Sequence, residues 1–267
     1  MKPILFYLGG FPVRAFGLLV GLGFVLGLWT SARRATRAGI HPNAVYDLGP
    51  WLLGGGLIGA RILYVITFWK TEFAREPFVE VFKIWNGGLV FYGGLILAIA
   101  VGIARVKQLK LPLWTLADAL APGIALGHAF GRLGCLMNGC CFGRPAELPW
   151  SIRFPAEHST HGLSVHPAQL YESLLDFALY AALAWWFPRR KFNGQIFALY
   201  LIAYAGVRSL SEYFRGDYSV TSAPLQGVLT PGQFMSVLIF LSGIVFWAVL
   251  HKRPSVPSIS STPSDPS

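Results

Sequence analysis

Long apolar segments, separated by short polar or basic connections, form the main pattern of this sequence. A helix needs about 20 apolar residues to cross the hydrocarbon core of a bilayer, so the pattern indicates a series of membrane-spanning helices. We predict spans at residues 16–30, 48–68, 89–103, 113–130, 170–187, 196–207 and 231–250. The predicted fold class is therefore an all-α, polytopic membrane protein with about seven transmembrane helices.

The basic residues between these spans predict the orientation of the chain. An odd number of spans places the two termini on opposite sides of the membrane, and four basic clusters then fall on one side. Lys and Arg are enriched in cytoplasmic connections, so we predict an exoplasmic N-terminus and a cytoplasmic C-terminus. The clusters are Arg33/Arg34/Arg37, Arg105/Lys107/Lys110, Arg189/Arg190/Lys191 and Lys252/Arg253.

The composition agrees with a membrane protein. Hydrophobic residues make up 54% of the 267 residues and charged residues 13%, whereas soluble domains carry about 25% charged residues. The formal net charge of +10 could suggest a nucleic-acid partner. The basic residues, however, lie in short clusters between apolar segments rather than on one soluble face, so no nucleic acid is expected.

The length leaves room for a single transmembrane domain, predicted at residues 1–253. The apolar stretch that begins at Ile4 contains Arg14 and lacks a convincing cleavage site. We therefore interpret it as part of an uncleaved first span rather than as a signal peptide. The Pro/Ser-rich residues 254–267 cannot bury enough apolar surface to fold and are predicted to be disordered.

A glycine-rich segment at residues 131–143, GRLGCLMNGCCFG, places an arginine directly after an apolar span. An ionised group at membrane depth costs several kcal/mol unless it faces a wet cavity, so Arg132 is predicted to bind an anion there. The alternative is an arginine that extends to the membrane interface. The glycines, at about 1 kcal/mol each in a helix, predict a broken helix or loop whose freed N–H groups could meet the anion.

A second polar stripe is formed by Arg208, Glu212 and Arg215, at i, i+4 and i+7 on one helix face. Together with Arg132, this stripe suggests two arginine contacts to a phosphate group, because the planar guanidinium binds phosphate oxygens in a bidentate manner. An internal ladder of salt bridges explains the same spacing, and both readings remain open at this point.

The glycine-rich segment resembles the signature of the bacterial prolipoprotein diacylglyceryl transferase family, membrane enzymes that lipidate the cysteine of lipoprotein precursors. Five further blocks resemble the same family in the same order: RILYV at 61–65, WNGG at 85–88, FYGGL at 91–95, HPAQLYE at 166–172 and the stripe at 208–215. The resemblance covers most of the chain between residues 61 and 215. The set of blocks is specific, whereas WNGG alone would mean little.

The resemblance implies that a diacylglyceryl group is transferred from phosphatidylglycerol to the thiol of a prolipoprotein, with glycerol phosphate as the leaving group. It implies a multi-pass protein of the bacterial cytoplasmic (inner) membrane, with the active site toward the exoplasmic face. The implied partners are phosphatidylglycerol, prolipoprotein signal peptides and membrane lipids. No cofactor and no metal are expected.

The resemblance also implies roles for individual residues. Arg132 would bind the lipid headgroup and stabilise the leaving group, Arg208 would make a second phosphate contact, and Glu212 would orient Arg208. Arg61 and Asp118 are also charged residues within predicted spans; they could pair across helices, and their spacing leaves a scaffold role and a role in the site equally open. Further substrate-binding positions expected from the matching blocks are Asn138, Gly134, Gly143, Arg215, Gly94, Arg61 and His166.

The sequence departs from the best-known family pattern, GRxGNFxNxExxG, at two positions of the segment, where Cys135 and Cys140 stand. In the FYGGL block, Tyr92 occupies the place of a histidine proposed as the catalytic base. A phenol with an ordinary pKa near ~10 is a poor base, whereas an imidazole near ~6.5 suits deprotonation of a thiol. We therefore predict that His128, one turn before Arg132, is the base; a packing histidine is the alternative.

Cys135, Cys140 and Cys141 are the only cysteines of the chain. They are read as small apolar residues that the chemistry does not need. A bridge between Cys135 and Cys140 is geometrically open, and a metal site is disfavoured because no C-x-x-C pair is present. Two other functions remain as alternatives: a lipid or anionic solute transporter, and a membrane thiol-redox protein.

Overall fold

A computed structural model describes residues 4–9, 11–74, 78–83, 87–217 and 230–253. Each of the seven predicted spans is an α-helix in this part of the chain. The helices are α1 (Ala15–Arg37), α2 (Pro42–Phe68), α3 (Phe91–Gln108), α4 (Leu113–Asn138), α5 (Ala168–Trp186), α6 (Gln195–Phe214) and α7 (Pro231–His251). The predicted tail 254–267 and the residues Trp85 and Asn86 of the WNGG block lie outside the described residues.

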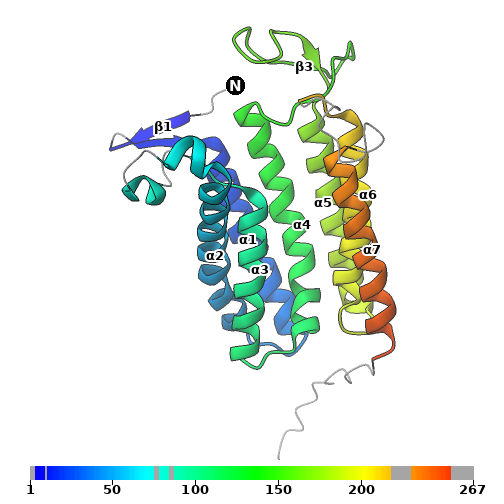
Figure 1. The fold of residues 1–267 in the computed structure, drawn as a ribbon. Helices are drawn as coiled ribbons and strands as arrows, with labels where there is room; N and C mark the ends of the chain where they lie inside the picture. Colours follow the sequence, from blue (N-terminus) through cyan, green and yellow to red (C-terminus); the bar gives the residue numbers. More distant parts are fainter. Residues whose placement is uncertain (1–3, 10, 75–77, 84–86, 218–229, 254–267) are drawn as a thin grey trace, which may run out of the picture.

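Successive helices run in alternating directions along one bundle (Figure 1). The α1–α2, α3–α4 and α5–α6 connections and the end of α7 all lie at one end, the lower end in Figure 1. The four basic clusters stand at the ends of α1, α3, α5 and α7, so we call this the basic end. The long connection between α4 and α5 lies at the opposite end.

In the part of the chain that the structure describes, two small antiparallel sheets make the fold mainly, rather than entirely, helical. Strands β1 (Ile4–Leu8) and β2 (Phe11–Arg14) form a hairpin before α1, so the prediction that the stretch from Ile4 belongs to the first span is wrong. Gly9 has a φ of +57°, which favours a turn, and Pro12 cannot donate a helical hydrogen bond. The second sheet pairs β3 (Ile152–Arg153) with β4 (Ser164–Val165) in the α4–α5 connection.

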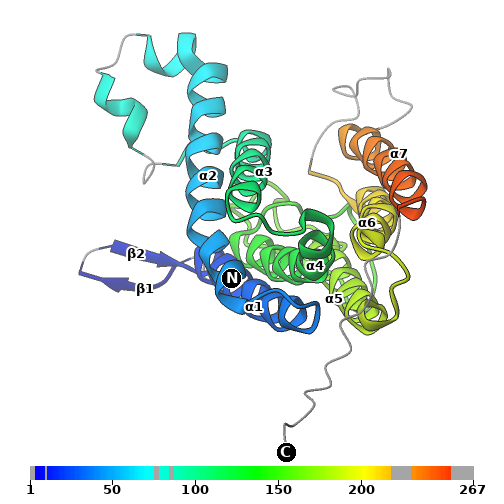
Figure 2. The same cartoon turned by 90° about the horizontal axis from the view of Figure 1, so that it is seen from below.

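Short one-turn helices complete the described elements: η1 (Trp69–Phe73) continues α2, η2 (Phe78–Phe82) follows it, and η4 (Phe187–Arg189) follows α5. Viewed along the bundle, α4 lies in the middle, with α1 and α5 against it, while α2 pairs with α3 and α7 with α6 (Figure 2). The central helix α4 also contacts α6. It is therefore the element that brings distant parts of the chain together.

Glycines allow two of these helix pairs to approach closely. A Cβ atom on Gly59 of α2 would lie 2.3 Å from the carbonyl oxygen of Gly93 of α3, and a Cβ atom on Gly27 of α1 would lie 2.8 Å from the carbonyl oxygen of Gly123 of α4. Small residues at such crossings let the two helix backbones come into direct van der Waals contact. In lipid, where apolar side chains gain nothing by leaving the solvent, this close packing is what holds helices together.

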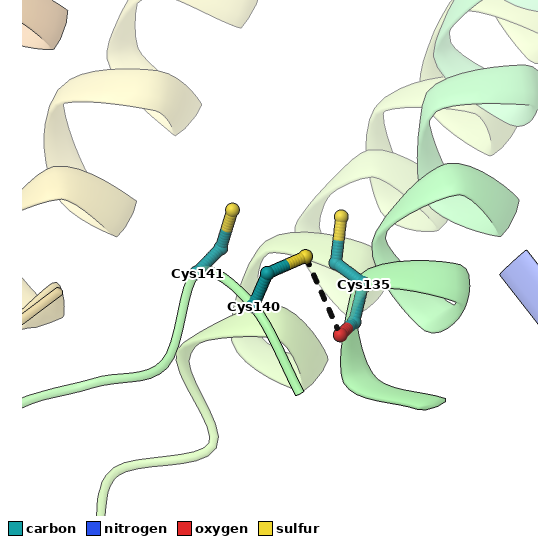
Figure 3. Close-up of side chains that lie close together, drawn as sticks. All are labelled: Cys135, Cys140 and Cys141. Carbon is teal, nitrogen blue, oxygen red and sulfur yellow. Dashed lines mark hydrogen bonds between the residues drawn. The ribbon is translucent and has the colours of Figure 1, made fainter. Parts of the chain in front are cut away.

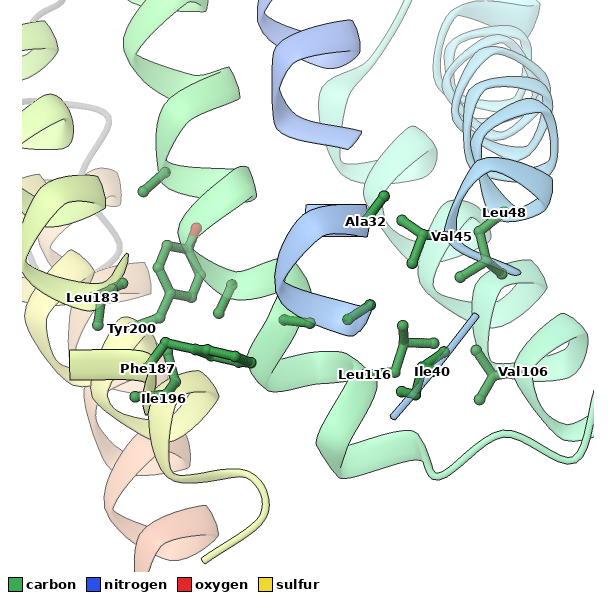
Figure 4. Packing of buried hydrophobic residues seen from close by; sticks show 14 of the residues in the cluster. Ala32, Ile40, Val45, Leu48, Val106, Leu116, Leu183, Phe187, Ile196 and Tyr200 are labelled. Atoms are coloured by element: carbon green, nitrogen blue, oxygen red, sulfur yellow. The ribbon is translucent and has the colours of Figure 1, made fainter. Parts of the chain in front are cut away.

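The buried apolar core occupies the basic end of the bundle. Ala32, Val45 and Leu48 lie on one side of α4, where Leu116 is next to Ile40, and Phe187 and Ile196 lie on the other side (Figure 4). The outward faces carry exposed apolar residues instead, such as Ile66 and Ile96, which are 67% and 68% exposed. An apolar exterior of this kind is typical of a protein whose solvent is lipid.

Among the described residues, four helical segments are long and apolar enough to cross a membrane by length and composition: Ala15–Arg37, Pro42–Phe73, Phe91–Gln108 and Pro231–His251. The other three long helices, α4, α5 and α6, carry the buried carboxylates of the described residues, whereas α1 carries the buried Arg34. Their lower hydropathy thus has a local cause, because they hold the polar side chains described below.

Asp118 has a structural role at the basic end. Its carboxylate accepts hydrogen bonds from the backbone N–H groups of Gly194 (2.8 Å) and Phe197 (3.0 Å), at the start of α6, and lies 3.7 Å from Arg190. The expectation that Asp118 could pair with Arg61 is wrong. Arg61 instead donates to backbone carbonyl oxygens near η2 and the α2–α3 connection.

Candidate active site

Helix α4 continues through most of the glycine-rich segment. It ends at Asn138, and Gly139 follows with a φ of +78°, the left-handed conformation that commonly terminates helices. Gly134 lets α4 pack closely against α1, because a Cβ atom there would lie 3.0 Å from the ring of Phe16 and the ring would have to shift. The prediction of a broken helix or loop across residues 131–143 is therefore wrong for residues 131–138, where helix packing outweighs the low helix propensity of glycine, and is confirmed for residues 139–143, which follow the helix end.

Arg132 lies on the face of α4 that meets α5. Its Nη2 atom is 3.0 Å from Oε1 of Glu172 on α5, and the same carboxylate lies 3.2 Å from Nη1 of Arg208 on α6. Glu172 is 2% exposed, so it is a buried carboxylate shared by two guanidinium groups. Three helices are joined by this pair of interactions.

The charged series continues along α6. Arg208 also contacts Glu212 at 2.6 Å, and Arg215 contacts Glu212 at 3.5 Å and Asp217 at 2.9 Å. Although burial disfavours the charged form of Arg215, its hydrogen bond to Asp217 raises its pKa above the ordinary value. We call Arg132, Glu172, Arg208, Glu212 and Arg215 the arginine ladder. The structure thus shows the salt-bridge ladder that the sequence left as one of two readings.

The ladder leaves one buried donor for a further ligand. Nε of Arg132 is buried and has no hydrogen-bond partner among the described residues. Oδ1 of Asp176, one turn beyond Glu172 on α5, is also buried without a partner there. Unsatisfied buried polar atoms are costly, so they mark positions where a ligand or water completes the hydrogen bonding.

His128 stands one turn before Arg132 and pairs with Asp176. The distance from its Nδ1 atom to Oδ2 of Asp176 is 2.7 Å, and Asp176 is fully buried, whereas the His128 side chain is 25% exposed. The ring also packs edge-on against Tyr204 of α6, at 5.3 Å between centroids. A carboxylate on Nδ1 sets the ring orientation and leaves Nε2 as the atom that can accept a proton.

The sequence indicates a polar stripe of Gln169, Glu172 and Asp176 on α5, but as a mainly architectural feature rather than as part of the site. Gln169, Glu172 and Asp176 are all buried on its inner face, where Gln169 donates to the carbonyl oxygen of Cys140 at 2.8 Å. Their i, i+3, i+7 spacing in an apolar helix was the available signal. The residues that these three side chains contact depend on how the helices pack, which the spacing does not reveal.

The connection after α4 holds several further predicted residues. Gly143 is in close backbone contact with His166, since a Cβ atom there would lie 2.5 Å from the carbonyl oxygen of His166. Gly143 also pairs with Arg215 in an isolated bridge. Asn138 is exposed and donates to the sulfur of Cys140 at 3.7 Å. The structure thus brings Gly143, Asn138 and His166 to the end of the ladder.

An apolar pocket of about 510 Å³ opens between α5, α6 and this connection. It is lined mainly by Trp150, Tyr171, Leu174, Leu210 and Phe214, and His166 also contributes to its wall. Ser211, a further lining residue, lies between Arg208 and Arg215 on α6. The pocket therefore places an apolar surface beside the charged ladder.

Three predicted site residues lie elsewhere, on the α2–α3 pair. Tyr92 is 49% exposed, and Gly94 packs against the carbonyl oxygen of Gly56, which a Cβ atom would approach to 2.7 Å. Arg61 lines a second, polar pocket of about 210 Å³ with Glu72 and other residues. No hydrogen bond or ion pair joins Arg61 or Tyr92 to the arginine ladder within the described part of the chain.

The helices alternate in direction, their outward faces are apolar, and a buried charged site joins α4, α5 and α6. These features define a multi-pass membrane protein with a polar centre. A family model described as prolipoprotein diacylglyceryl transferase matches residues 3–249. The chain belongs to this family, as its motifs led us to expect. Family membership favours a transferase over the transporter and thiol-redox alternatives.

Curated relatives support the assignment over nearly the whole chain. The phosphatidylglycerol–prolipoprotein diacylglyceryl transferase of Finegoldia magna is 34% identical over 259 residues, covering 97% of this chain and 99% of the relative. The enzyme of the same name from Trichormus variabilis is 34% identical and covers 98% of this chain and 95% of its own length. A relative from Clostridium perfringens, numbered 2, is 31% identical, with 93% and 95% covered.

Proposed function

We propose that this protein transfers a diacylglyceryl group from phosphatidylglycerol to the cysteine thiol of prolipoproteins. One observation carries the proposal: His128, oriented by Asp176, lies one turn before Arg132 on the same helix. The Nε atom of Arg132 is buried and has no hydrogen-bond partner among the described residues. A proton acceptor and an anion ligand on one helix face are the two groups that this displacement needs.

The reaction is a displacement at a glycerol carbon. The thiol sulfur of the acceptor forms a bond to that carbon as the bond from the carbon to the phosphate oxygen breaks, and glycerol phosphate leaves. Nε2 of His128 takes the thiol proton, which later passes to water. Arg132 binds the phosphate oxygens and stabilises the charge that develops on the leaving group.

The arginine ladder orients the cationic groups. Glu172 holds the guanidinium groups of Arg132 and Arg208 at fixed positions, and Glu212 does the same for Arg208 and Arg215. We assign the second phosphate contact to Arg208, with Glu212 as the residue that orients it. Preorganised donors of this kind lower the cost of charge development, because they need no rearrangement during the reaction.

The apolar pocket beside the ladder fits a lipid substrate. Its walls of Leu174, Leu210 and Phe214 would receive an acyl chain or the apolar part of a prolipoprotein signal peptide, with the reacting centre toward Arg208. Asn138, Gly134, Gly143 and His166 would shape the headgroup region, whereas Arg61 and Gly94 would act on the α2–α3 side. The partners are therefore phosphatidylglycerol, signal peptides and membrane lipids.

We place all seven helices across the bacterial cytoplasmic membrane, as one domain at residues 1–253. The basic end would face the cytoplasm because of its Lys and Arg clusters, and the α4–α5 connection would face the exoplasm. This orientation puts the arginine ladder and the apolar pocket toward the side on which lipoprotein precursors emerge. The N-terminus would be exoplasmic and the C-terminus cytoplasmic.

Complementation tests the proposed function. The chain is expressed in a strain depleted of its own transferase, and a reporter lipoprotein is analysed by mass spectrometry. The expected result is a diacylglyceryl adduct on the reporter cysteine and restored growth. An unmodified reporter, in cells where the protein is inserted at normal levels, would contradict the proposal.

A further inference from the structure

The three cysteines form a cluster that the proposed reaction does not use. Cys135 lies in the last turn of α4, and Cys140 and Cys141 follow the helix end. The three Sγ atoms all lie within 4.8 Å of one another, and all three thiols are free (Figure 3). The chain has no other cysteine, so its entire thiol content converges on one point.

We propose that Cys135, Cys140 and Cys141 form a three-thiolate binding site for a soft monovalent metal ion, such as Cu(I). A metal–sulfur bond of about 2.3 Å places the three sulfurs of a trigonal site about 4.0 Å apart. The observed spacing reaches that geometry with side-chain shifts of less than about 1 Å. The lack of a C-x-x-C pair, which disfavoured a metal in the sequence, is overcome because a helix end folds Cys140 back toward Cys135.

The number of ligands selects the ion. Structural zinc sites are almost always four-coordinate, whereas soft thiolate ligands suit Cu(I), for which three ligands suffice. No fourth His, Cys, Asp or Glu ligand joins the three sulfurs among the residues that the structure describes. The donor set therefore matches a trigonal ion better than a tetrahedral one.

The surroundings compensate the charge of such a site. Three thiolates and one monovalent cation carry a net charge of −2. Once ionised, Cys141 would be attracted by the guanidinium groups of Arg132 and Arg215, and Cys135 by that of Arg132. Asn138 donates an N–H group to the Cys140 sulfur. Cations and hydrogen-bond donors around a metal centre stabilise its anionic ligands.

The backbone of the cluster is held in place before any ion binds. Gln169 donates to the Cys140 carbonyl oxygen at 2.8 Å, and Nε2 of His158 contacts the Gly139 carbonyl oxygen at 2.7 Å. Cys141 has a φ of +60°, a left-handed conformation that is uncommon for a cysteine. Residues held in such conformations by their surroundings are found at ligand sites more often than elsewhere.

Binding releases protons, because the thiols become thiolates as the metal–sulfur bonds form and their protons pass to the buffer. No oxidant or reductant is consumed, since the ion enters and stays as Cu(I). The proposal does not depend on the transferase activity, and it is therefore tested without any turnover measurement.

The test uses the full-length protein in lipid nanodiscs under anaerobic, reducing conditions. Cu(I) is supplied in competition with a colorimetric Cu(I) chelator, and bound copper, released protons and thiolate-to-copper absorption are measured. We expect one Cu(I) per chain. Cys135→Ser, Cys140→Ser and Cys141→Ser should each weaken binding by more than about tenfold, the loss seen when even a supporting residue is removed. Met137→Leu removes a neighbouring sulfur outside the trio and should bind as the parent does.

Several results would overturn the site. They are sub-stoichiometric Cu(I) binding, unchanged affinity in all three serine variants, binding of Zn(II) in place of Cu(I), and alkylation showing that two of the thiols are joined in a disulfide in cells. Loss of Cu(I) binding in Met137→Leu alone would also assign the ion to other ligands. None of these outcomes bears on whether the protein transfers lipid, so the two proposals fail separately.

Discussion

At the scale of single residues, Arg132 combines an ion pair to Glu172 with a buried Nε atom that has no partner among the described residues. A lysine would keep the charge but could not supply the planar set of donors. We expect Arg132→Lys to lower kcat/KM about 100-fold, as the loss of two charge-assisted hydrogen bonds worth ~3 kcal/mol predicts. The assay uses phosphatidylglycerol and a peptide acceptor in detergent.

Arg105→Lys is the matched control for this prediction. Arg105 also pairs with a carboxylate, that of Asp47 at 2.7 Å, but it lies at the basic end, away from the ladder. This variant should keep the parent's turnover. Equal turnover by Arg132→Lys and the parent would remove Arg132 from phosphate binding.

His128 and Tyr92 compete for the role of base, and their contacts favour His128. Without the imidazole that Asp176 orients, His128→Gln should lose most activity and recover partly as pH rises, because the acceptor thiol, with an ordinary pKa near ~8.5, then ionises unaided. Tyr92→Phe should lose at most about tenfold, the equivalent of one hydrogen bond of roughly 1.4 kcal/mol. The pH profile of kcat/KM is measured for both variants; an inactive Tyr92→Phe beside a fully active His128→Gln would reverse the assignment.

The cysteines should be dispensable for transfer, since thiol attack on the lipid needs no enzyme-bound intermediate. We expect Cys140→Ala to keep turnover within about threefold of the parent, the scatter of a conservative change near a site. Activity and thermal stability are measured together. A folded Cys140→Ala protein without transfer would show that this thiol takes part in the chemistry.

At the scale of elements, the glycine contacts between helices decide how closely α2 and α3 pack. Gly59→Val would drive side-chain atoms into the backbone of Gly93, at a cost of about 1–3 kcal/mol or more, so its melting temperature in detergent should fall. Gly54→Val, on the same helix, is the control, because a Cβ atom there meets no other atom within 4 Å. A similar fall for both variants would mean that helix propensity, and not the crossing, sets the stability.

At the scale of the whole molecule, the basic end predicts the topology. In a background without native cysteines, a single cysteine placed near Arg190 should stay unlabelled by an impermeant reagent in intact cells, whereas one placed in the connection at residues 144–166 should be labelled. Opening the cells should expose the first probe. Labelling of the Arg190 probe in intact cells would invert the proposed orientation.

The sequence by itself determined the helices and the family. Apolar segments bounded by polar residues located all seven α-helices of the described chain, because a run of apolar residues needs a hydrogen-bonded backbone wherever water is absent. The glycine-rich segment around Arg132 and the five further blocks, taken as a set in one order, identified the family that the family model confirms. These are local properties, which neighbouring residues encode without reference to the rest of the fold.

Only the tertiary structure decided which charged groups meet. Along the helical residues 131–138, Gly134 packs against Phe16 of α1, a contact that no local pattern contains. Glu172 joins Arg132 to Arg208, and Asp176 meets His128, because α4, α5 and α6 adjoin with a particular rotation about their axes. The sequence spacing predicts that such residues share a face of one helix, but the neighbouring helix toward which that face turns is set by the packing of the whole bundle.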